Sequence, residues 1–338
     1  MMIRRSEIRA AAAICAALVG AGFASGREVE TFFARLGRGS WLGVAAACSG
    51  LGFLSYAVMS LARRVRGANF PDLYGGLING RCRTAMHLVH GLLTLITAAA
   101  MIAAGGELGA LALDLPNARL IGAASVLLAG VGLAAAGIPA LGRLGLAAAA
   151  LIAGVYAALA LTQNGRAAFS REGLAAAAPM GLLYAAFNGA LAGGVMTAAA
   201  REDAHPVHTG ALVALIMLSM LLPANAALLR CDARLRWAAL PAVVMTARWG
   251  TTGYYTAIAL ILLAVLTTLG AMLSSLRDQA AALRLKRAPA LAICAALAAL
   301  ASVCGFETLV NKVYPVLGWI CAFALLSLLL RWPDDSAK

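Results

Sequence analysis

Ten apolar segments, most of them close to 20 residues long, follow one another along the chain with only short polar links between them. About 20 apolar residues is the length that an α-helix needs to cross the hydrocarbon core of a bilayer. Hydrophobic residues make up 62% of the 338 residues and charged residues only 12%, and the mean hydropathy of +0.87 is far above that of soluble domains. The sequence therefore predicts an all-α integral membrane protein with ten transmembrane helices.

The predicted spans leave no room for a separate soluble domain, so we expect one transmembrane domain over residues 1–338, surrounded by the lipid bilayer. The spans run over residues 9–34, 41–62, 84–112, 118–137, 141–163, 174–200, 207–229, 253–283, 288–305 and 313–331. The first is followed by many others, which indicates a retained span and not a cleaved signal peptide. The seven cysteines are scattered, mostly in apolar runs, and are interpreted as packing residues.

Lysine and arginine in the links predict the orientation. An even number of spans places both termini on one side of the membrane, and that side holds more than half of the basic residues, including the clusters "RRVRG" (63–67) and "RLKR" (284–287). Because cytoplasmic loops are enriched in Lys and Arg, both termini are expected in the cytoplasm. The net charge of +13 is explained by these loops and by contact with anionic lipids, so no nucleic-acid partner is expected.

The stretch "GAGFASGRE" (20–28) lies inside the first predicted span and contains Gly20, Gly22 and Gly26. Each glycine lowers helix stability by about 1 kcal/mol relative to alanine. Inside a bilayer, a backbone group that leaves the helical ladder needs another partner. The stretch predicts a broken helix whose free groups are satisfied by the protein or by a ligand.

The sixth span is predicted to be broken too, at Asn188-Gly189, with Gly193-Gly194 one turn later. The interval between the two breaks, added to the starts of spans one to five, comes close to the starts of spans six to ten. Matching interrupted segments in two halves indicate a secondary transporter with repeats, here 9–163 and 174–331, and an odd number of spans per repeat makes the repeats inverted. The alternative is that these glycines only allow neighbouring helices to pack closely.

Three motifs resemble the YkvI-like bacterial membrane protein family: "VGAGFASGREVETFF" in the first span, "LYAAFN" in the sixth and "NKVYPVLGWI" in the last. This family belongs with the amino acid–polyamine–organocation superfamily. The resemblance implies the LeuT-type fold, a 5+5 inverted repeat with helices one and six broken, in the bacterial cytoplasmic membrane. Two residues depart from the motifs, Arg27 in place of Gln and Phe187 in place of Tyr.

The resemblance also implies where a substrate binds. The break in the first span would offer backbone N–H groups to an anion and carbonyls to a cation. The implied substrate residues are Gly20, Ala21, Gly22, Phe23, Ala24, Ser25, Tyr184, Phe187 and Asn188. For Phe187, ordinary aromatic packing is an equal alternative.

In sodium-coupled members of this fold, a hydroxyl pair in the eighth helix joins carbonyls of the first helix around Na⁺. This correspondence implies a sodium site of Thr267, Thr268, Ala16 and Val19 in this chain, and such oxygen ligands suit a hard cation. The alternative is that each threonine bonds a carbonyl of its own helix. No cofactor is expected apart from Na⁺ or H⁺ as a coupling ion.

Glu107 is predicted to be the only carboxylate well inside a span. A charged group within the bilayer is costly and marks a functional site by default, so Glu107 is a candidate proton carrier or counter-ion for a cationic substrate. A gate ion pair with Arg27 is equally compatible with the sequence. Glu28 and Glu30 are expected nearer the surface, where Arg27 and Glu28 would gate the outer half of the first span.

Two histidine pairs, at 87/90 and 205/208, have the i, i+3 spacing that can bind a metal, but no carboxylate or cysteine completes a ligand set, so no metal site is expected. Walker and GxSxG motifs are absent, which disfavours an ATP-driven pump or an enzyme. The sequence therefore favours a secondary active transporter for a small polar solute, an amino acid or organic amine, coupled to Na⁺ or H⁺. The alternative function is a ligand sensor or receptor subunit that keeps the transporter fold but does not accumulate the solute.

Overall fold

The structure is a computed structural model, and it describes residues 3–65, 70–78, 80–136, 139–163, 165, 171–282 and 286–330. Its described residues form helices and turns only. The first predicted span consists of α1 (Arg5–Leu18), α2 (Ala21–Ala24) and α3 (Arg27–Phe32). The other long helices are α4 (Ser40–Val65), α6 (Gly80–Ala112), α7 (Ala118–Ala136), α8 (Pro139–Thr162), α9 (Arg171–Ala199), α10 (Pro206–Arg230), α13 (Gly250–Ala282), α14 (Arg287–Ser302) and α16 (Tyr314–Leu329).

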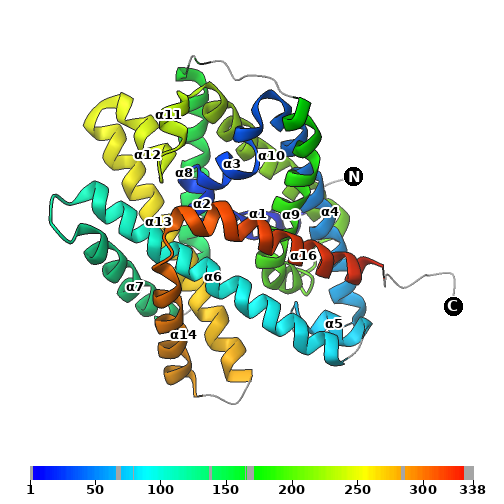
Figure 1. The fold of residues 1–338 in the computed structure, drawn as a ribbon. Helices are drawn as coiled ribbons and strands as arrows, with labels where there is room; N and C mark the ends of the chain where they lie inside the picture. The colour runs from blue at the N-terminus through cyan, green and yellow to red at the C-terminus, as the bar shows by residue number, and fades with distance from the viewer. Residues whose placement is uncertain are drawn as a thin grey trace.

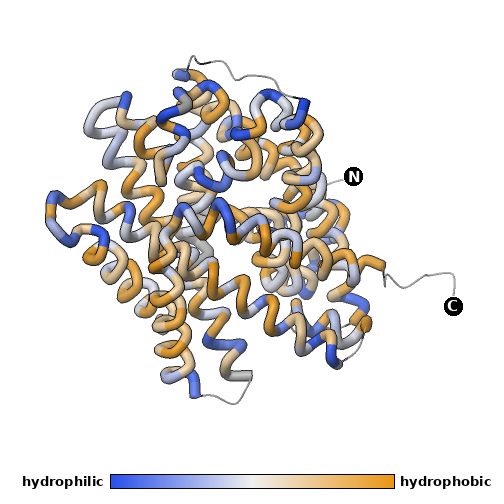
Figure 2. The backbone as a smooth tube through the Cα atoms, viewed as in Figure 1, coloured by the Kyte–Doolittle hydropathy of each residue, from blue (hydrophilic) through white to orange (hydrophobic). Residues whose placement is uncertain are grey.

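Short helices connect or extend these elements. They are η1 (Ala34–Gly39), α5 (Asp72–Leu77), α11 (Ala233–Arg236), α12 (Pro241–Thr246), η2 (Ala247–Trp249), α15 (Phe306–Thr308) and the π-helix η3 (Leu309–Val313). Within the described residues, seven helical stretches are long and apolar enough to cross a membrane. Hydrophilic residues gather at helix ends and connections, and the helix bodies are mostly hydrophobic (Figure 2). The chain is thus a multi-pass membrane protein.

The helices pack as two groups (Figure 1). In the first group, α4 packs against α9 and α10, and α1 packs against α9 and α10. In the second group, α6, α7, α13 and α14 pack against one another. α8 contacts α1, α10 and α13, and α16 contacts α9, so these two helices join the groups. The break in the first span lies where the groups meet, because α2 contacts α13 while α3 contacts α9 and α10.

Glycines allow the closest helix contacts. A Cβ atom on Gly43 of α4 would lie 2.7 Å from the carbonyl oxygen of Ala177 in α9, and one on Gly52 would lie 2.8 Å from the carbonyl oxygen of Gly210 in α10. Small residues at such positions let helix backbones approach, which is how membrane helices gain van der Waals packing.

The prediction that the sixth span is broken is wrong, because α9 runs without interruption through Asn188 and Gly189. Asn188 Nδ2 donates to the carbonyl oxygen of Tyr184, one turn earlier in the same helix, at 3.2 Å. The glycines serve close packing instead. A Cβ atom would lie 2.8 Å from Leu54 Cδ1 at Gly189, and 2.5 Å from Phe70 Cγ at Gly193.

Candidate substrate site at the break in the first helix

The first predicted break is confirmed, and it consists of two interruptions. Helix α1 ends at Leu18, where Val19 leaves helical geometry (φ −93°, ψ 87°) and Gly20 is extended (φ −92°, ψ −175°). After the single turn of α2, Gly26 has a φ of +85°, a left-handed conformation that favours glycine. The last carbonyls of α1 and the first N–H groups of α2 consequently lack partners within their own helices.

Side chains and backbone from other helices satisfy the second interruption. The Tyr156 hydroxyl from α8 lies 3.1 Å from the carbonyl oxygens of both Phe23 and Ala24. The Ala242 N–H at the start of α12 donates to the carbonyl oxygen of Ser25 at 2.9 Å, and Ser25 Oγ donates to the carbonyl oxygen of Gly22 at 3.1 Å. At the first interruption, no hydrogen bond to the Val19 carbonyl or the Gly20 N–H is found among the described residues.

The predicted sodium residues differ in their surroundings. Thr268 lies beside the first interruption, since a Cβ atom on Gly20 would be 3.6 Å from Thr268 Oγ1. Thr267 Oγ1 instead donates within its own helix, to the carbonyl oxygens of Leu263 at 2.9 Å and Ala264 at 3.1 Å. A hydroxyl that donates its proton keeps oxygen lone pairs for a cation. The sodium site stays a prediction, with Thr268 the better placed of the two threonines.

Aromatic side chains from α9 pack against the segment that follows the break. The ring of Tyr184 lies edge-on to Phe32 and Phe33, with centroids 5.4 and 5.1 Å apart, and the Phe187 ring lies 4.3 Å from Tyr314 of α16. All five side chains are buried. The predicted residues Tyr184 and Phe187 therefore lie in an aromatic cluster next to α3, while the amide of Asn188 bonds its own helix.

Glu28 is the site residue whose environment the sequence did not reveal. It is only 5% exposed, and its Oε2 has no hydrogen-bond partner in the described part of the chain. Its carboxylate lies against Gly22, because a Cβ atom there would be 2.5 Å from Glu28 Cδ and would overlap Oε1. Glu28 also interacts electrostatically with Tyr156, Tyr184 and Tyr314. The expectation that Glu28 and Glu30 lie nearer the surface is wrong, since Glu30 is only 3% exposed as well.

Glu107, in contrast, is not enclosed. Its side chain is 23% exposed, and its Oε2 lies 3.2 Å from Arg119 Nη2 at the start of α7. The considered ion pair with Arg27 is absent, since each of the two residues has a different partner. Burial of Glu28 follows from the break, because α2 and Gly26 turn the chain so that α3 runs inside the helix bundle. The hydropathy pattern of the first span does not indicate that the chain turns inward at this point.

Arg27 belongs to a polar cluster that ties α3 to the region before α16. Its guanidinium pairs with Glu307 of α15 and donates to the carbonyl oxygen of Ala238 at 3.2 Å. Thr31 Oγ1 donates to Asn311 Oδ1 of η3 at 2.6 Å. We call Arg27, Thr31, Glu307 and Asn311 the Arg27 cluster. Arg27 thus joins α3 to α15, and its role as a gate residue stays a prediction.

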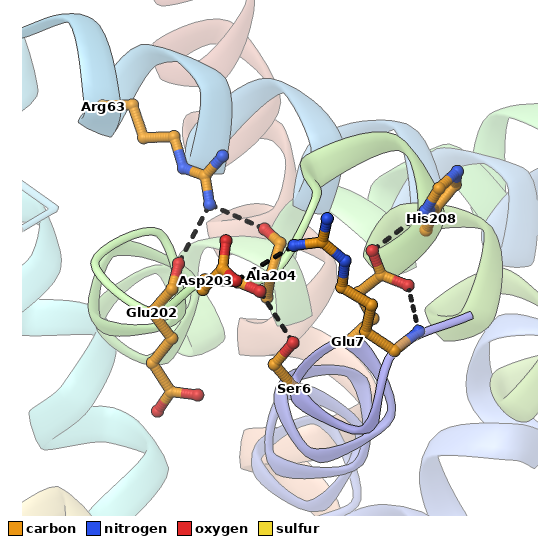
Figure 3. A network of polar contacts seen from close by, with 8 residues as sticks. Ser6, Glu7, Arg63, Glu202, Asp203, Ala204 and His208 are labelled. Atoms are coloured by element: carbon orange, nitrogen blue, oxygen red, sulfur yellow. Dashed lines mark hydrogen bonds and ion pairs between the residues drawn. The ribbon is translucent and has the colours of Figure 1, made fainter. Parts of the chain in front are cut away.

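A second polar cluster lies at the other end of the first span (Figure 3). Ser6 Oγ donates to the carbonyl oxygen of Asp203 at 2.7 Å, and Glu7 Oε1 lies 2.9 Å from His208 Nδ1. Arg4 pairs with Asp203, and Arg63 of α4 donates to the carbonyl oxygens of Glu202 and Ala204. We call Arg4, Ser6, Glu7, Arg63, Asp203 and His208 the Asp203 cluster. The Asp203 and Arg27 clusters lie at opposite ends of the first span, with the break between them.

The sequence matches no known family profile and no curated protein. The fold is similar to that of Mhp1, a nucleobase-cation-symport-1 family transporter, solved in a closed conformation with bromovinylhydantoin bound. The match has a TM-score of 0.50 and 16% sequence identity, and it covers 93% of this chain and 76% of that chain. The chain thus has the LeuT-type fold, whereas the YkvI-like resemblance rests on the motifs alone.

Proposed function

We propose that the protein is a secondary active transporter that carries a small polar solute, an amino acid or organic amine, across the membrane by alternating access. The observation that carries this proposal is the first-span break, which leaves the Val19 carbonyl and the Gly20 N–H without partners at the junction of two helix groups. Non-helical backbone at membrane depth is tolerated only where it is buried in protein or lines a water-filled cavity. In transporters of this kind, interrupted helices form the substrate site near the membrane midplane.

The helix contacts support a 5+5 inverted repeat of ten spans within one transmembrane domain. If each helix is exchanged for the one five spans away, several packed pairs are replaced by other packed pairs. The α6–α7 contact becomes α13–α14, α7–α13 becomes α6–α14, α4–α9 becomes α1–α10, and α1–α8 becomes α9–α16. The contacts α4–α10 and α6–α13 map onto themselves.

The two polar clusters are suited to alternate as gates. Opening one end of the path requires loss of the Arg27 cluster, and opening the other requires loss of the Asp203 cluster. With both termini in the cytoplasm of a bacterial cell, the Asp203 cluster is the cytoplasmic gate and the Arg27 cluster the outer one. A hydrogen bond that is exchanged for one to water has a small net free energy, so each gate is weak enough to open during transport.

Coupling to Na⁺ is supported by the position of Thr268 beside Gly20. A cation held there by hydroxyl and carbonyl oxygens would join α13 to the end of α1 and fix the geometry of the break. Because linkage is reciprocal, sodium would then raise substrate affinity by the same factor as substrate raises sodium affinity. Thr268→Ala is expected to remove most of this effect, and Thr267→Ala, with its hydroxyl bonded inside α13, is the matched comparison.

The test is substrate counterflow in proteoliposomes, screened over amino acids and organic amines with and without a sodium gradient. A transporter accumulates labelled solute against a preloaded pool. Saturable binding without any counterflow would favour the alternative function, a receptor subunit, and would contradict the proposal. Accumulation that depends on a pH gradient and not on sodium would retain transport but replace Na⁺ by H⁺.

A further inference from the structure

Glu28 resembles one half of an ion pair whose positively charged partner is missing from the described part of the chain. Its carboxylate is buried at the break, between α2 and the helix groups, and its Oε2 has no hydrogen-bond partner in the described part of the chain. The neighbouring Arg27 is held by Glu307 and by the carbonyl oxygen of Ala238, so it does not compensate Glu28. A buried carboxylate without a partner is strongly disfavoured, and in membrane proteins such groups mark ligand or ion sites.

The space for this carboxylate is provided by Gly22. Any side chain at that position would collide with Glu28 Cδ and Cγ, at 2.5 and 2.6 Å from the Cβ atom. The absence of a Cβ atom thus brings the carboxylate directly to the α2 backbone. Ala21 and Phe23, which flank Gly22, are also fully buried, so the carboxylate is enclosed on the side of the break.

The charge of the Glu28 carboxylate reaches three tyrosines from three different helices: Tyr156 of α8, Tyr184 of α9 and Tyr314 of α16. The Tyr156 hydroxyl is used by the α2 carbonyls. The Tyr184 hydroxyl is fully buried and has no hydrogen-bond partner among the described residues. The Tyr314 hydroxyl interacts with the side chain of Thr97. The unpartnered groups on this side of the break are therefore Glu28 Oε2 and the Tyr184 hydroxyl.

We propose that Glu28 binds the positive charge of the substrate, which is then an organic ammonium ion. The inference rests on the proposed function and specifies its substrate class. An ammonium group has donors only, which match the oxygens of the Glu28 carboxylate and of the Tyr184 hydroxyl. The faces of aromatic rings also attract cations, and the charge of Glu28 reaches three tyrosines. An anionic solute would be repelled by Glu28.

The site differs from the predicted sodium site, which lies at the first interruption beside Thr268. Glu28 lies instead against the α2 backbone at Gly22. The carboxylate and the unpartnered Tyr184 hydroxyl favour a ligand with more than one donor, as in a primary ammonium group.

The test uses the full chain in lipid nanodiscs and measures thermal stabilisation and equilibrium binding of three matched probes: phenethylamine, 2-phenylethanol and 3-phenylpropionate. A second set, leucine and uracil, represents a zwitterion and a neutral heterocycle. The wild type is expected to bind the amine at least tenfold more tightly than the alcohol and to bind no carboxylate. Glu28→Gln is expected to remove this preference, whereas Glu172→Gln, the same change at an exposed position of α9, is expected to keep it.

Glu28→Asp keeps the charge and is expected to bind the amine more weakly than the wild type but more tightly than Glu28→Gln. This second variant keeps the inference testable if Glu28→Gln fails to fold. Three results overturn the inference: no amine binding by the wild type, unchanged amine binding by Glu28→Gln, or tighter binding of uracil or the alcohol than of the amine. Counterflow of a neutral solute that Glu28→Gln does not affect would contradict this inference but would still support the proposed transport function. Amine binding without counterflow would support this inference but contradict the transport function.

Discussion

At the scale of single residues, the contact between Gly22 and Glu28 is testable through protein stability. Gly22→Ala places a methyl group on the carboxylate, and such overpacking costs about 1–3 kcal/mol. Glu28→Ala removes the obstacle, so Gly22→Ala is expected to cost less in that background. Denaturant unfolding of the wild type, both single variants and the double variant gives this coupling energy. Additive effects of the two changes would show that the residues do not touch.

Glu7 predicts a pH dependence at the Asp203 cluster. The Arg4 N–H, first, and the His208 ring lower the pKa of Glu7 below its usual value of 4.5. A folded pKa that lies below the unfolded one contributes stability above about pH 4.5, and that contribution is lost as the pH falls through the folded pKa. Thermal unfolding between pH 7 and pH 3 is therefore expected to show a steeper loss for the wild type than for Glu7→Gln. Parallel curves would contradict it.

Which carboxylate is buried could not be predicted from the sequence, for a physical reason. Glu107 stands in a long apolar run, yet its helix ends five residues later and leaves it within reach of Arg119. Glu28 follows a polar stretch, yet the turn at Gly26 directs α3 into the bundle. Hydropathy along the chain reports the average environment of a segment. The environment of one side chain depends on where the backbone bends.

At the scale of elements, α2 and α9 are expected to differ in dynamics. α2 is one turn long, and its first amides have no intrahelical acceptor, whereas Tyr184–Asn188 lie in the interior of the 29-residue helix α9. Amide hydrogen exchange in nanodiscs is expected to be fast in Ala21–Ala24 and slow around Tyr184–Asn188, although both segments are buried. A bound substrate is expected to slow exchange in α2 selectively. Equal exchange in the two segments would contradict a labile break.

Span positions were predictable from hydropathy: nine of the ten apolar segments contain a helix whose ends lie within a few residues of the predicted ones, and the first contains three shorter helices. Breaks were predictable only in part. Both Gly20–Gly26 and Asn188–Gly194 weaken a helix intrinsically, but the free energy of packing decides the outcome. In α9 the glycines meet Leu54 and Phe70, so close packing compensates their low helix propensity. The sequence shows the low helix propensity of these glycines, but it does not show which side chains pack against them.

At the scale of the whole molecule, the proposal requires that the Arg27 cluster opens during transport. Thr31→Cys and Asn311→Cys, at positions whose side-chain oxygens lie 2.6 Å apart, would join α3 to η3 by a disulfide. Oxidation is expected to stop counterflow, and reduction is expected to restore it. The variant requires Cys304, the exposed native cysteine, to be replaced by Ser.

The control for that cross-link is either single cysteine variant under the same oxidant. Full counterflow by the oxidised double variant, with the disulfide verified by mass spectrometry, would show that this end of the molecule need not open. Binding of substrate by the cross-linked protein is expected to persist from the other side, because the Asp203 cluster is unchanged.

The π-helix at Leu309–Val313 has a consequence for how the chain tolerates insertions and deletions. A π-turn holds one residue more than an α-turn over the same length, so it behaves as a one-residue insertion inside a helix. Deleting Val313 would leave a regular α-helix and keep α16 in place. The residues before the π-turn would also keep their positions, because the remaining α-turn covers the same length with one residue fewer. Glu307 lies before the π-turn and would stay opposite Arg27, whereas Asn311 lies inside it and would lose its position opposite Thr31.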